Sequence, residues 1–469
     1  MMKETQLNEE LGIRNEEEAK LYQLDGMPKF KLAFPLALQH FLMMFVGTIT
    51  PAILIGNAAQ VTPAQMVIMV QAVIFVSGLA TLCAVYPIKI GKLQIGPKLP
   101  VVYGTSAVFT APAIMVAERA HELNYQNVIG IIFGGLMVAA LAEGVVGIFY
   151  KQLKKFFPPI VIGCVLISTG LHLLTVGAGN LAGGRANADF GSPQNLAIGF
   201  TVFFTYVLLT RFGKGLWKIS AMLIAMAVGY GISVALGIVD FSAVGQSRMI
   251  AMPMPFALGI ELHGWAITSF IVIFLVSGLS TIGYTAAICS GGLDREATAK
   301  ETSSALLLDS LSSSIGAMFG AMPSSECGQN AGLVSMTKLV NRWIIGLCGL
   351  LLVGVGMSPQ LAAIFAAIPP AVLGGSILPI FAMILNNGIM MVAQDGFSQR
   401  NLAVLGMSFA IGLGFAGDMG ATAYMPGIIQ FFFRDRIALI AICSIIFNLL
   451  FPEDKKPAVN EDKVVEENA

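Results

Sequence analysis

Two neighbouring carboxamides, Gln329 and Asn330, are the residues in this sequence best suited to bind a small molecule. A carboxamide offers both a donor and an acceptor, which matches the alternating N–H and C=O groups along the edge of a heterocyclic base or an imide. Amides in apolar surroundings can also bridge two helices. Gly328 precedes the pair and Gly332 follows it, which predicts the start of a short helix. This position favours ligand binding over a bridging role.

Two acidic residues, Asp309 and Glu326, lie deep in apolar sequence. A carboxylate at the centre of a membrane helix costs about 2.5 to 3.5 kcal/mol to insert, so each needs a compensating role. Serines around Asp309 indicate a polar helix face turned inward, where it is either a proton or sodium relay or a hydrogen-bond partner for another helix. We interpret Glu326 as part of the binding site, with a rim residue or a capping acid as the alternatives.

Two further polar positions lie in apolar segments. His40 follows Gln39 in the first of them. A single interior histidine is often only a satisfied hydrogen-bonding group, but together with the distant carboxylates we interpret His40 as part of the site architecture. Glu143 stands beside Gly144 near the end of its segment. It is expected to reach toward the membrane surface or to pair locally.

The stretch Met322–Arg342 must position the carboxamides. As a continuous helix, Pro323–Thr337 would cover only about 22 Å of a roughly 30 Å hydrocarbon core. If residues 323–328 are extended and a helix begins near Gln329, about 20 Å of strand and about 13 Å of helix together suffice. Many transporters build a substrate site from such a broken span. Leu99–Val116 also has a proline near its start and a glycine-polar turn a few residues later, and a β-branched pair lies between them, so it is also expected to be extended and then helical.

The composition predicts an all-α integral membrane protein. The chain is 56% hydrophobic and 12% charged, about half the charged share of a soluble domain. Its long continuous apolar stretches exclude a transmembrane β-barrel. A net charge of zero suggests no nucleic-acid partner, and the six cysteines lack metal-ligand spacing, so we expect no cofactor and no metal. The polar, acidic N-terminus has no apolar core and is not expected to be a cleavable signal peptide.

Two pairs of similar segments indicate a duplicated unit. The heptad Ile368–Gly374 repeats Phe157–Gly163 at an offset of 368 − 157 = 211 residues, and the prolines of the two broken spans are 323 − 100 = 223 residues apart. We therefore expect about fourteen transmembrane helices in two inverted sets of seven. The expected parts are an N-terminal tail, two seven-span repeats and a C-terminal tail, at residues 1–30, 31–240, 241–451 and 452–469.

Basic residues are concentrated in alternate loops. The heavily basic side includes Lys89, Lys98, Lys154, Arg211, Arg295, Lys300 and Arg342. The positive-inside rule places this side in the cytoplasm. We expect a multi-pass protein of the plasma or inner membrane with both termini in the cytoplasm.

The segment GQNAGLVSMTK resembles the signature of the nucleobase–ascorbate transporter family, also called nucleobase:cation symporter-2 or the xanthine/uracil permeases. That signature is an amide, acid or proline, then Asn-x-Gly, four variable residues, a threonine and a basic or small residue. These five places are filled here by Gln329, Asn330, Gly332, Thr337 and Lys338. The resemblance continues through nearly the whole chain, at Gln39-His40, Gly104-Thr105-Ser106, Asp309 and the Pro-Pro segments.

The resemblance implies a core and a gate domain, a homodimer, and proton- or sodium-coupled uptake of a nucleobase by an elevator-like movement. Glutamine at position 329 is similar to the purine branch of the family, which carries xanthine or urate. Uracil or another heterocycle, or an inorganic anion carried by the same fold, remains an alternative. An integral-membrane enzyme is disfavoured, because the sequence has no paired-aspartate metal motif, nucleophile elbow or histidine-rich cluster.

Three departures from the family pattern concern the substrate contacts. The family carries a Glu-Thr-Ile-Gly-Asp pattern in its eighth span, where this chain has Ser280 and Tyr284 at the two acidic places. A stacking phenylalanine is replaced by Ala107, and Glu326 takes a place usually filled by a small hydroxyl residue. The resemblance assigns these positions, with Gly328, to the substrate site. We hypothesise that Glu326 supplies the acid that the eighth span lacks.

Overall fold

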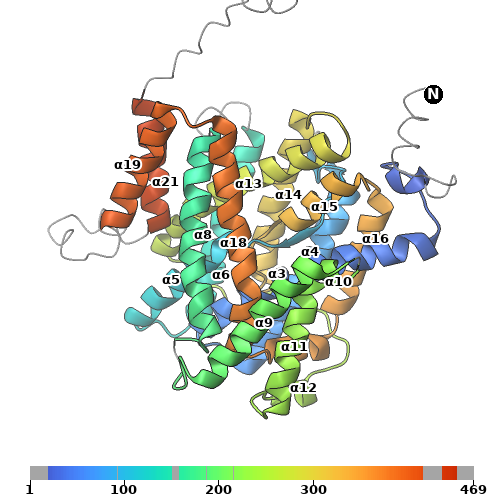
Figure 1. Cartoon of the computed structure of the whole chain (residues 1–469), viewed down its shortest axis with the longest axis vertical. Coiled ribbons are helices and arrows are strands. Elements are labelled where there is room, and N and C mark those ends of the chain that lie inside the picture. The colour runs from blue at the N-terminus through green and yellow to red at the C-terminus, as the bar shows by residue number, and fades with distance from the viewer. Residues whose placement is uncertain are drawn as a thin grey trace, which may run out of the picture. The chain divides into compact units, whose positions relative to one another are not determined.

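Helices make up most of the structure, a computed structural model that describes residues 19–91, 93–149, 158–185, 187–214, 216–415 and 436–451 (Figure 1). Up to residue 250 the helices are η1 (Lys20–Tyr22), α3 (Phe30–Ala58), α4 (Pro63–Val85), η2 (Ala107–Phe109), α5 (Thr110–Glu122), α6 (Val128–Ile148), α8 (Pro159–Leu181), α9 (Pro193–Phe212), α10 (Leu216–Ile219), α11 (Ala221–Ala235) and α12 (Ser242–Gln246). After it they are α13 (Gly264–Ala287), the π-helical turn η4 (Ile288–Gly292), α14 (Ala299–Met318), α15 (Gly328–Thr337), α16 (Arg342–Gly356), α17 (Pro359–Ala366), α18 (Pro370–Asp395), α19 (Gln399–Phe415) and α21 (Arg436–Leu450).

Several of these helices can cross a membrane. Seven described helices are long and apolar enough, or eight if α16 and α17, which are bent by 84°, form one span. This confirms a multi-pass helical architecture, while the count of fourteen spans stays a prediction. Two of the predicted spans contain only short helices, since α5 and α15 have 13 and 10 residues and each follows a strand in the same apolar segment. Residues 416–435 lie outside the described part.

The chain divides into two compact units. They are Met1–Lys154 with Thr169–Ile384, and Lys155–Ser168 with Leu385–Ala469. In the smaller unit, apolar side chains of α8, α18, α19 and α21 form one buried cluster: Ile160, Val161, Cys164, Val392, Val404 and Ile440. The predicted boundary near residue 240 separates two sequence repeats. The division into compact units does not test it, and it stays a prediction.

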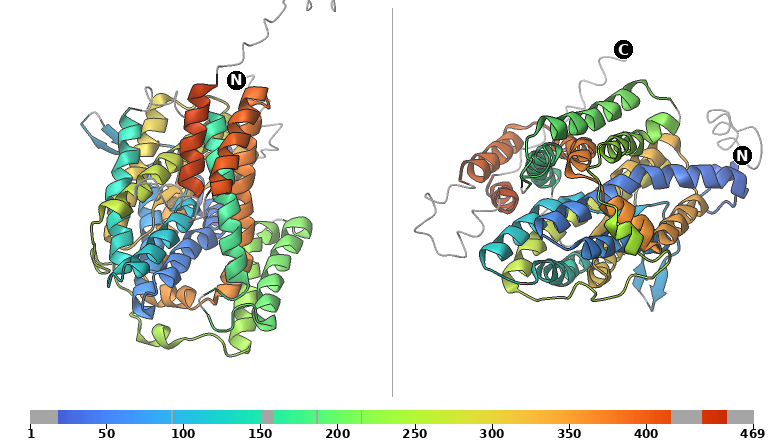
Figure 2. Two further views of the ribbon diagram at one scale, coloured as in Figure 1. Left: turned by 90° about the vertical axis from the view of Figure 1, so that its left-hand side faces the viewer. Right: turned by 90° about the horizontal axis from the view of Figure 1, so that it is seen from below.

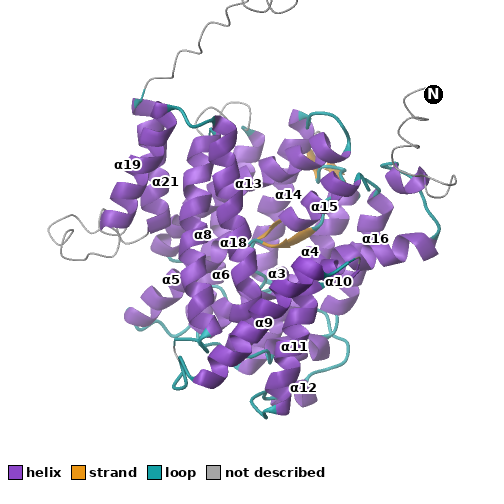
Figure 3. Cartoon of the chain, in the orientation of Figure 1, coloured by secondary structure: helices purple, strands orange, loops and turns teal. Residues whose placement is uncertain are grey.

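Two short strands in the larger unit come from the two predicted broken spans. Strand β3 (Tyr103–Thr105) pairs antiparallel with β4 (Ser324–Glu326), with Tyr103 opposite Glu326 (Figure 3). Helix α15 follows β4 and begins at Gly328, which confirms the extended-then-helical prediction. The pairing gives the extended backbone hydrogen-bond partners that a membrane would not supply. It also requires Gly104, because a Cβ there would lie 2.6 Å from Cys327 Sγ.

Strands β1 (Ile88–Ile90) and β2 (Leu93–Ile95) form a hairpin that projects beyond the end of α4, drawn as blue arrows in Figure 2.

The loop after α15 holds the segment that precedes α3. The Asn341 side-chain amide donates hydrogen bonds of 2.8 to 3.1 Å to three backbone carbonyls of residues 20–26. The adjacent Arg342 pairs with Asp25 and donates to the Val85 carbonyl at 2.6 Å. These contacts join residues 20–26 to the loop that follows α15. We call this set of contacts the N-terminal clip.

Candidate functional site

The carboxamide of Asn330 connects α15 to α3. Its Nδ2 lies 3.0 Å from Nδ1 of His40 and donates to the His40 backbone carbonyl at 3.1 Å. Both side chains are almost fully buried. The Asn330 Oδ1 atom is buried and has no hydrogen-bond partner among the described residues. The amide nitrogen of Asn330 is therefore bonded within the protein, and only its oxygen is available to accept a hydrogen bond from a ligand.

Gln329 is placed differently. It is half-buried in the first turn of α15, and its side chain makes no hydrogen bond within the described part of the chain. Both its donor and its acceptor are available. Successive residues of a helix are rotated by about 100° about its axis, so the side chains of Gln329 and Asn330 point in different directions. Gln39, next to His40 on α3, is also half-buried.

The two predicted carboxyls are buried and held by hydroxyl groups of one helix. The Thr285 hydroxyl of α13 donates to Glu326 Oε1 at 2.8 Å, and the Thr281 hydroxyl donates to Asp309 Oδ2. Each carboxyl keeps one oxygen, Glu326 Oε2 and Asp309 Oδ1, without a partner in the described residues. Because the threonines are four residues apart, they lie on one face of α13. That helix aligns both acids.

One of the two eighth-span departures, Tyr284, lies close to α15. A Cβ on Gly328 would be 2.8 Å from the ring of Tyr284, so the aromatic ring packs on the first residue of α15. The Ser280 hydroxyl is enclosed and has no hydrogen-bond partner among the residues that the structure describes. Ala107 begins the short helix η2, directly after β3.

The remaining signature residues have local roles at the far end of α15. The Thr337 hydroxyl donates to the Leu333 carbonyl at 2.7 Å. Lys338 ends the helix with a left-handed φ of 56° and forms an ion pair with Asp294 at 2.9 Å. Gly332 is exposed, and a Cβ there would meet nothing within 4 Å. Neither of these two contacts involves the residues around Gln329.

Three residues of this region were not found by sequence reasoning: Tyr103, Thr281 and Thr285. The Tyr103 hydroxyl donates to the Ala305 carbonyl at 3.4 Å, one turn before Asp309 on α14. The spacing of the threonines was visible in the sequence as two hydroxyl groups four residues apart, but only the position of α14 and β4 shows what they bind.

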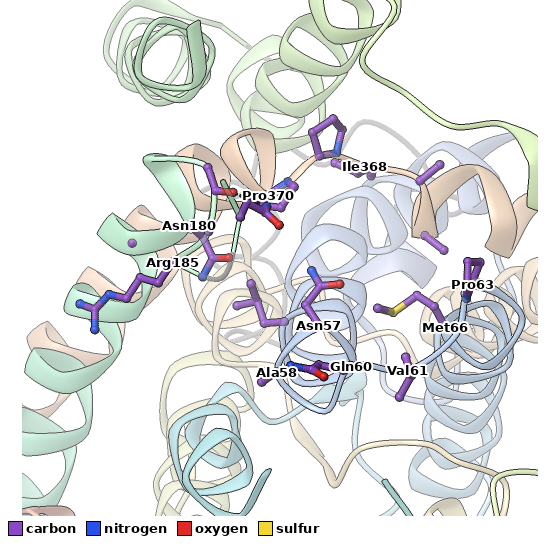
Figure 4. Close-up of a pocket in the computed structure, with 18 of the residues that line it drawn as sticks. Asn57, Ala58, Gln60, Val61, Pro63, Met66, Asn180, Arg185, Ile368 and Pro370 are labelled. Carbon is purple, nitrogen blue, oxygen red and sulfur yellow. Dashed lines mark hydrogen bonds between the residues drawn. The ribbon is translucent and has the colours of Figure 1, made fainter. Parts of the chain in front are cut away.

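A separate cavity of about 1070 Å³ lies at the ends of α3, α5 and α8 (Figure 4). Its lining includes Asn57, Gln60, Asn180 and Asp240, and none of the predicted site residues. Hydrogen bonds from the backbone and the side chain of Ser242 lower the pKa of Asp240, so this carboxyl is ionised near neutral pH. Apolar and polar side chains both line this cavity, and the carboxamides and the buried acids form a different region.

Comparison with known proteins gives a consistent result. The model of the Permease family (Xan_ur_permease) matches residues 31–419. The chain is 31% identical to "Xanthine permease" of Bacillus subtilis (strain 168) over 425 residues, which are 90% of this chain and 94% of that relative. It is 32% identical to "Uric acid permease PucJ" of the same organism over 434 residues, or 90% and 93% of the two chains.

Solved structures share the fold at low sequence identity. The transmembrane domain of the cyanobacterial bicarbonate transporter BicA matches with a TM-score of 0.59 and 16% identity, covering 89% of this chain and 98% of that one. SLC26A9 matches with a TM-score of 0.60 and 12% identity, covering 90% and 66%. At such identities the likeness concerns the fold alone.

Proposed function

Because the chain belongs to the xanthine/uracil permease family, we propose that it is a cation-coupled secondary transporter that imports a purine such as xanthine or urate. Membership of this family makes it a multi-pass membrane transport protein rather than an enzyme. The purine is inferred from the names of relatives at 31% and 32% identity and from Gln329 at the first signature position.

One observation supports substrate binding most strongly. The Gln329 amide lies at the start of a half-helix and makes no internal hydrogen bond among the described residues. Its donor and acceptor can pair with one N–H and one C=O on the edge of a purine dione. The free Oδ1 of Asn330 adds an acceptor for a second N–H group. A ligand that lacks this edge would leave the Gln329 amide and the buried Asn330 Oδ1 unpaired, so the site would discriminate against it.

The coupling cation is assigned to Asp309 and Glu326. Each is buried and keeps one oxygen free of described partners, so each can hold a proton or contribute a ligand to sodium. In an alternating-access cycle, the cation neutralises these carboxyls and makes the loaded site less costly to move through the membrane. His40 positions α15 through Asn330.

An anion carrier is the alternative that the fold relatives suggest. The N-terminus of α15 would attract an anion, since helix N-termini carry partial positive charge. Glu326 lies only two residues before Gly328, where a carboxylate would oppose an anion. This charge arrangement favours a heterocycle held by hydrogen bonds over a small inorganic anion.

The decisive experiment is uptake into proteoliposomes. Radiolabelled xanthine, urate, uracil and sulfate would be offered with an inward proton gradient, an inward sodium gradient, or no gradient. We expect uphill accumulation of unchanged xanthine or urate with one gradient only. Accumulation of sulfate without any purine uptake would overturn the proposal, and preferred uptake of uracil would correct its substrate.

We further propose a homodimer in the plasma or inner membrane with both termini in the cytoplasm. Crosslinking of the purified protein at low concentration tests the dimer. Labelling of single cysteines placed at residues 20 and 450 in intact cells tests the orientation, and reaction with an impermeant reagent would contradict it.

A further inference from the structure

A third buried carboxyl, Glu143 of α6, lies beside the two acids already described. Its side chain is 1% exposed, and its Oε1 has no hydrogen-bond partner in the described part of the chain. The prediction that it reaches the membrane surface is therefore wrong. The reason is packing, because Gly144 brings α6 against α14 so closely that a Cβ there would lie 2.6 Å from Ser310 Oγ.

Helix α13 aligns all three carboxyls. A Cβ on Gly278 would lie 3.1 Å from Glu143 Oε1, so the carboxyl occupies the space left by that glycine. One turn later Thr281 binds Asp309, and one turn after that Thr285 binds Glu326. Positions 278, 281 and 285 are three and four residues apart and thus share one face of the helix. They span 285 − 278 = 7 residues, or about 10 Å along the axis.

We propose that Glu326, Asp309 and Glu143 form a file that carries the coupling proton, with Glu143 as its member farthest from α15. This inference rests on the proposed transport function and deepens it, since it makes the coupling ion a proton. It also explains why the chain can dispense with the two eighth-span acids of its family. The acids are supplied instead by β4 and α6, and α13 supplies only hydroxyl groups and a glycine.

The carboxyls exchange protons in balanced steps. A proton leaves the carboxyl of Glu326 for the carboxylate of Asp309, and a proton then leaves Asp309 for the carboxylate of Glu143. Each step converts the donor to a carboxylate and the acceptor to a neutral acid, so the total charge of the file does not change. The Asp309 charge acts on both Glu143 and Glu326, as expected of neighbours in a low-dielectric interior.

A proton suits this file because of what surrounds it. An ionised carboxylate in an apolar interior is costly, and adjacent carboxyls reduce that cost by sharing protons. Other titratable groups near the acids include Tyr103 of β3, which lies opposite Glu326, and Tyr284 of α13, which lies against the start of α15. Two thiols are also near: Cys327 directly follows Glu326 in the chain, and Cys289 follows Thr285 by four residues. Each acid has one oxygen that makes no hydrogen bond to a described residue and can donate or accept one.

The test compares Glu143→Gln with Glu296→Gln, an exposed glutamate in the loop before α14, in proteoliposomes. Two rates are measured for each variant: exchange of labelled for unlabelled purine without a gradient, and accumulation driven by an inward proton gradient. We expect E143Q to keep exchange within about twofold of wild type and to lose accumulation by roughly tenfold or more. E296Q should keep both. Accumulation by E143Q at the wild-type level, or accumulation that follows only a sodium gradient, would overturn the proposal.

A second variant leaves the acid in place and disturbs its position. Gly278→Ala adds a Cβ that would be 3.1 Å from both Glu143 Oε1 and Leu306 Cδ2. It should show the same loss of accumulation with exchange preserved, and Glu143→Asp should restore part of the coupling that E143Q loses. Unaltered coupling in G278A would count against the geometry.

Infrared spectroscopy supplies a readout that needs no substrate. Protonated buried carboxyls give a C=O stretching band that shifts in deuterated water, and E143Q should lose one component of it while E296Q does not. An unchanged band would overturn the proton file. If wild-type protein exchanges no purine at all, the proposed function fails, whereas the infrared comparison still decides whether the file holds protons.

Discussion

Nδ2 of Asn330 lies 3.0 Å from Nδ1 of His40, and the same nitrogen donates to the His40 backbone carbonyl. Helix α3 thus holds α15 through two hydrogen bonds from a single amide. One of the two neighbouring carboxamides is in this way committed to architecture, while Gln329 stays available for a ligand.

Removal of the His40 ring should loosen α15. We expect His40→Ala to destabilise the protein by about 1 to 3 kcal/mol, because it leaves a buried amide hydrogen unpaired and creates a cavity. The measurement is the melting temperature of the ligand-free protein. Gln39→Ala at the adjacent half-buried position should change stability by less than about 0.5 kcal/mol. Equal effects of both substitutions would argue against the anchoring role.

Removal of the Gln329 amide should weaken ligand binding without lowering the stability of the ligand-free protein. Gln329→Ala is expected to weaken purine binding by roughly tenfold to a hundredfold, since the amide has no internal partner to lose. The melting temperature without ligand should stay at the wild-type value, while the thermal stabilisation by xanthine or urate should disappear. Thr337→Val on the same helix should bind normally, as that hydroxyl bonds only within the end of α15. Normal binding by the Gln329 variant would remove it from the site.

The contact between Gly328 and Tyr284 can be tested by a double-mutant cycle. Gly328→Ala should cost about 1 to 3 kcal/mol, because its Cβ would lie 2.8 Å from the tyrosine ring. Truncation by Tyr284→Ala provides space, so the double variant should recover about 1 kcal/mol relative to the sum of the single effects. If the losses of stability in the two single variants simply add in the double variant, positions 328 and 284 do not interact. Thermal unfolding of the four proteins supplies the data.

Glu326 can be neutralised without a change of shape. Glu326→Gln is expected to abolish uptake while expression and folding persist, because the amide oxygen can still accept the Thr285 hydrogen bond but the group cannot carry a proton. Thr285→Val should reduce uptake less, since it removes one hydrogen bond and leaves the acid. Size-exclusion profiles control for folding. Wild-type transport by E326Q would refute the role of this carboxyl.

Much of the fold could be read from local sequence. Proline and a glycine-polar turn inside an apolar stretch predicted extended backbone before a half-helix, and both strands and α15 agree with that prediction. The signature around Asn330 identified the family, which the family model and the relatives confirm. These features depend on φ, ψ preferences and on chain length across the bilayer, which are local properties.

Contacts between helices could not be read in the same way. The membrane helices are apolar on nearly all sides, so periodicity does not reveal which face of α6 meets α13. The sequence therefore gave no indication that Glu143 lies at Gly278, nor that Thr281 and Thr285 hold Asp309 and Glu326. Pairing of β3 with β4 joins segments more than 200 residues apart, and a register of that kind comes only from the tertiary fold.

The N-terminal clip has a practical consequence for handling this protein. Asn341, in the loop that directly follows α15, donates hydrogen bonds from one nitrogen to three carbonyls of residues 20–26. An affinity tag or fluorescent fusion joined at residue 27 would delete all three acceptors and disturb that loop, while one attached ahead of residue 19 would spare them. The fusion at residue 27 would also remove Asp25 and leave Arg342 without this ion-pair partner.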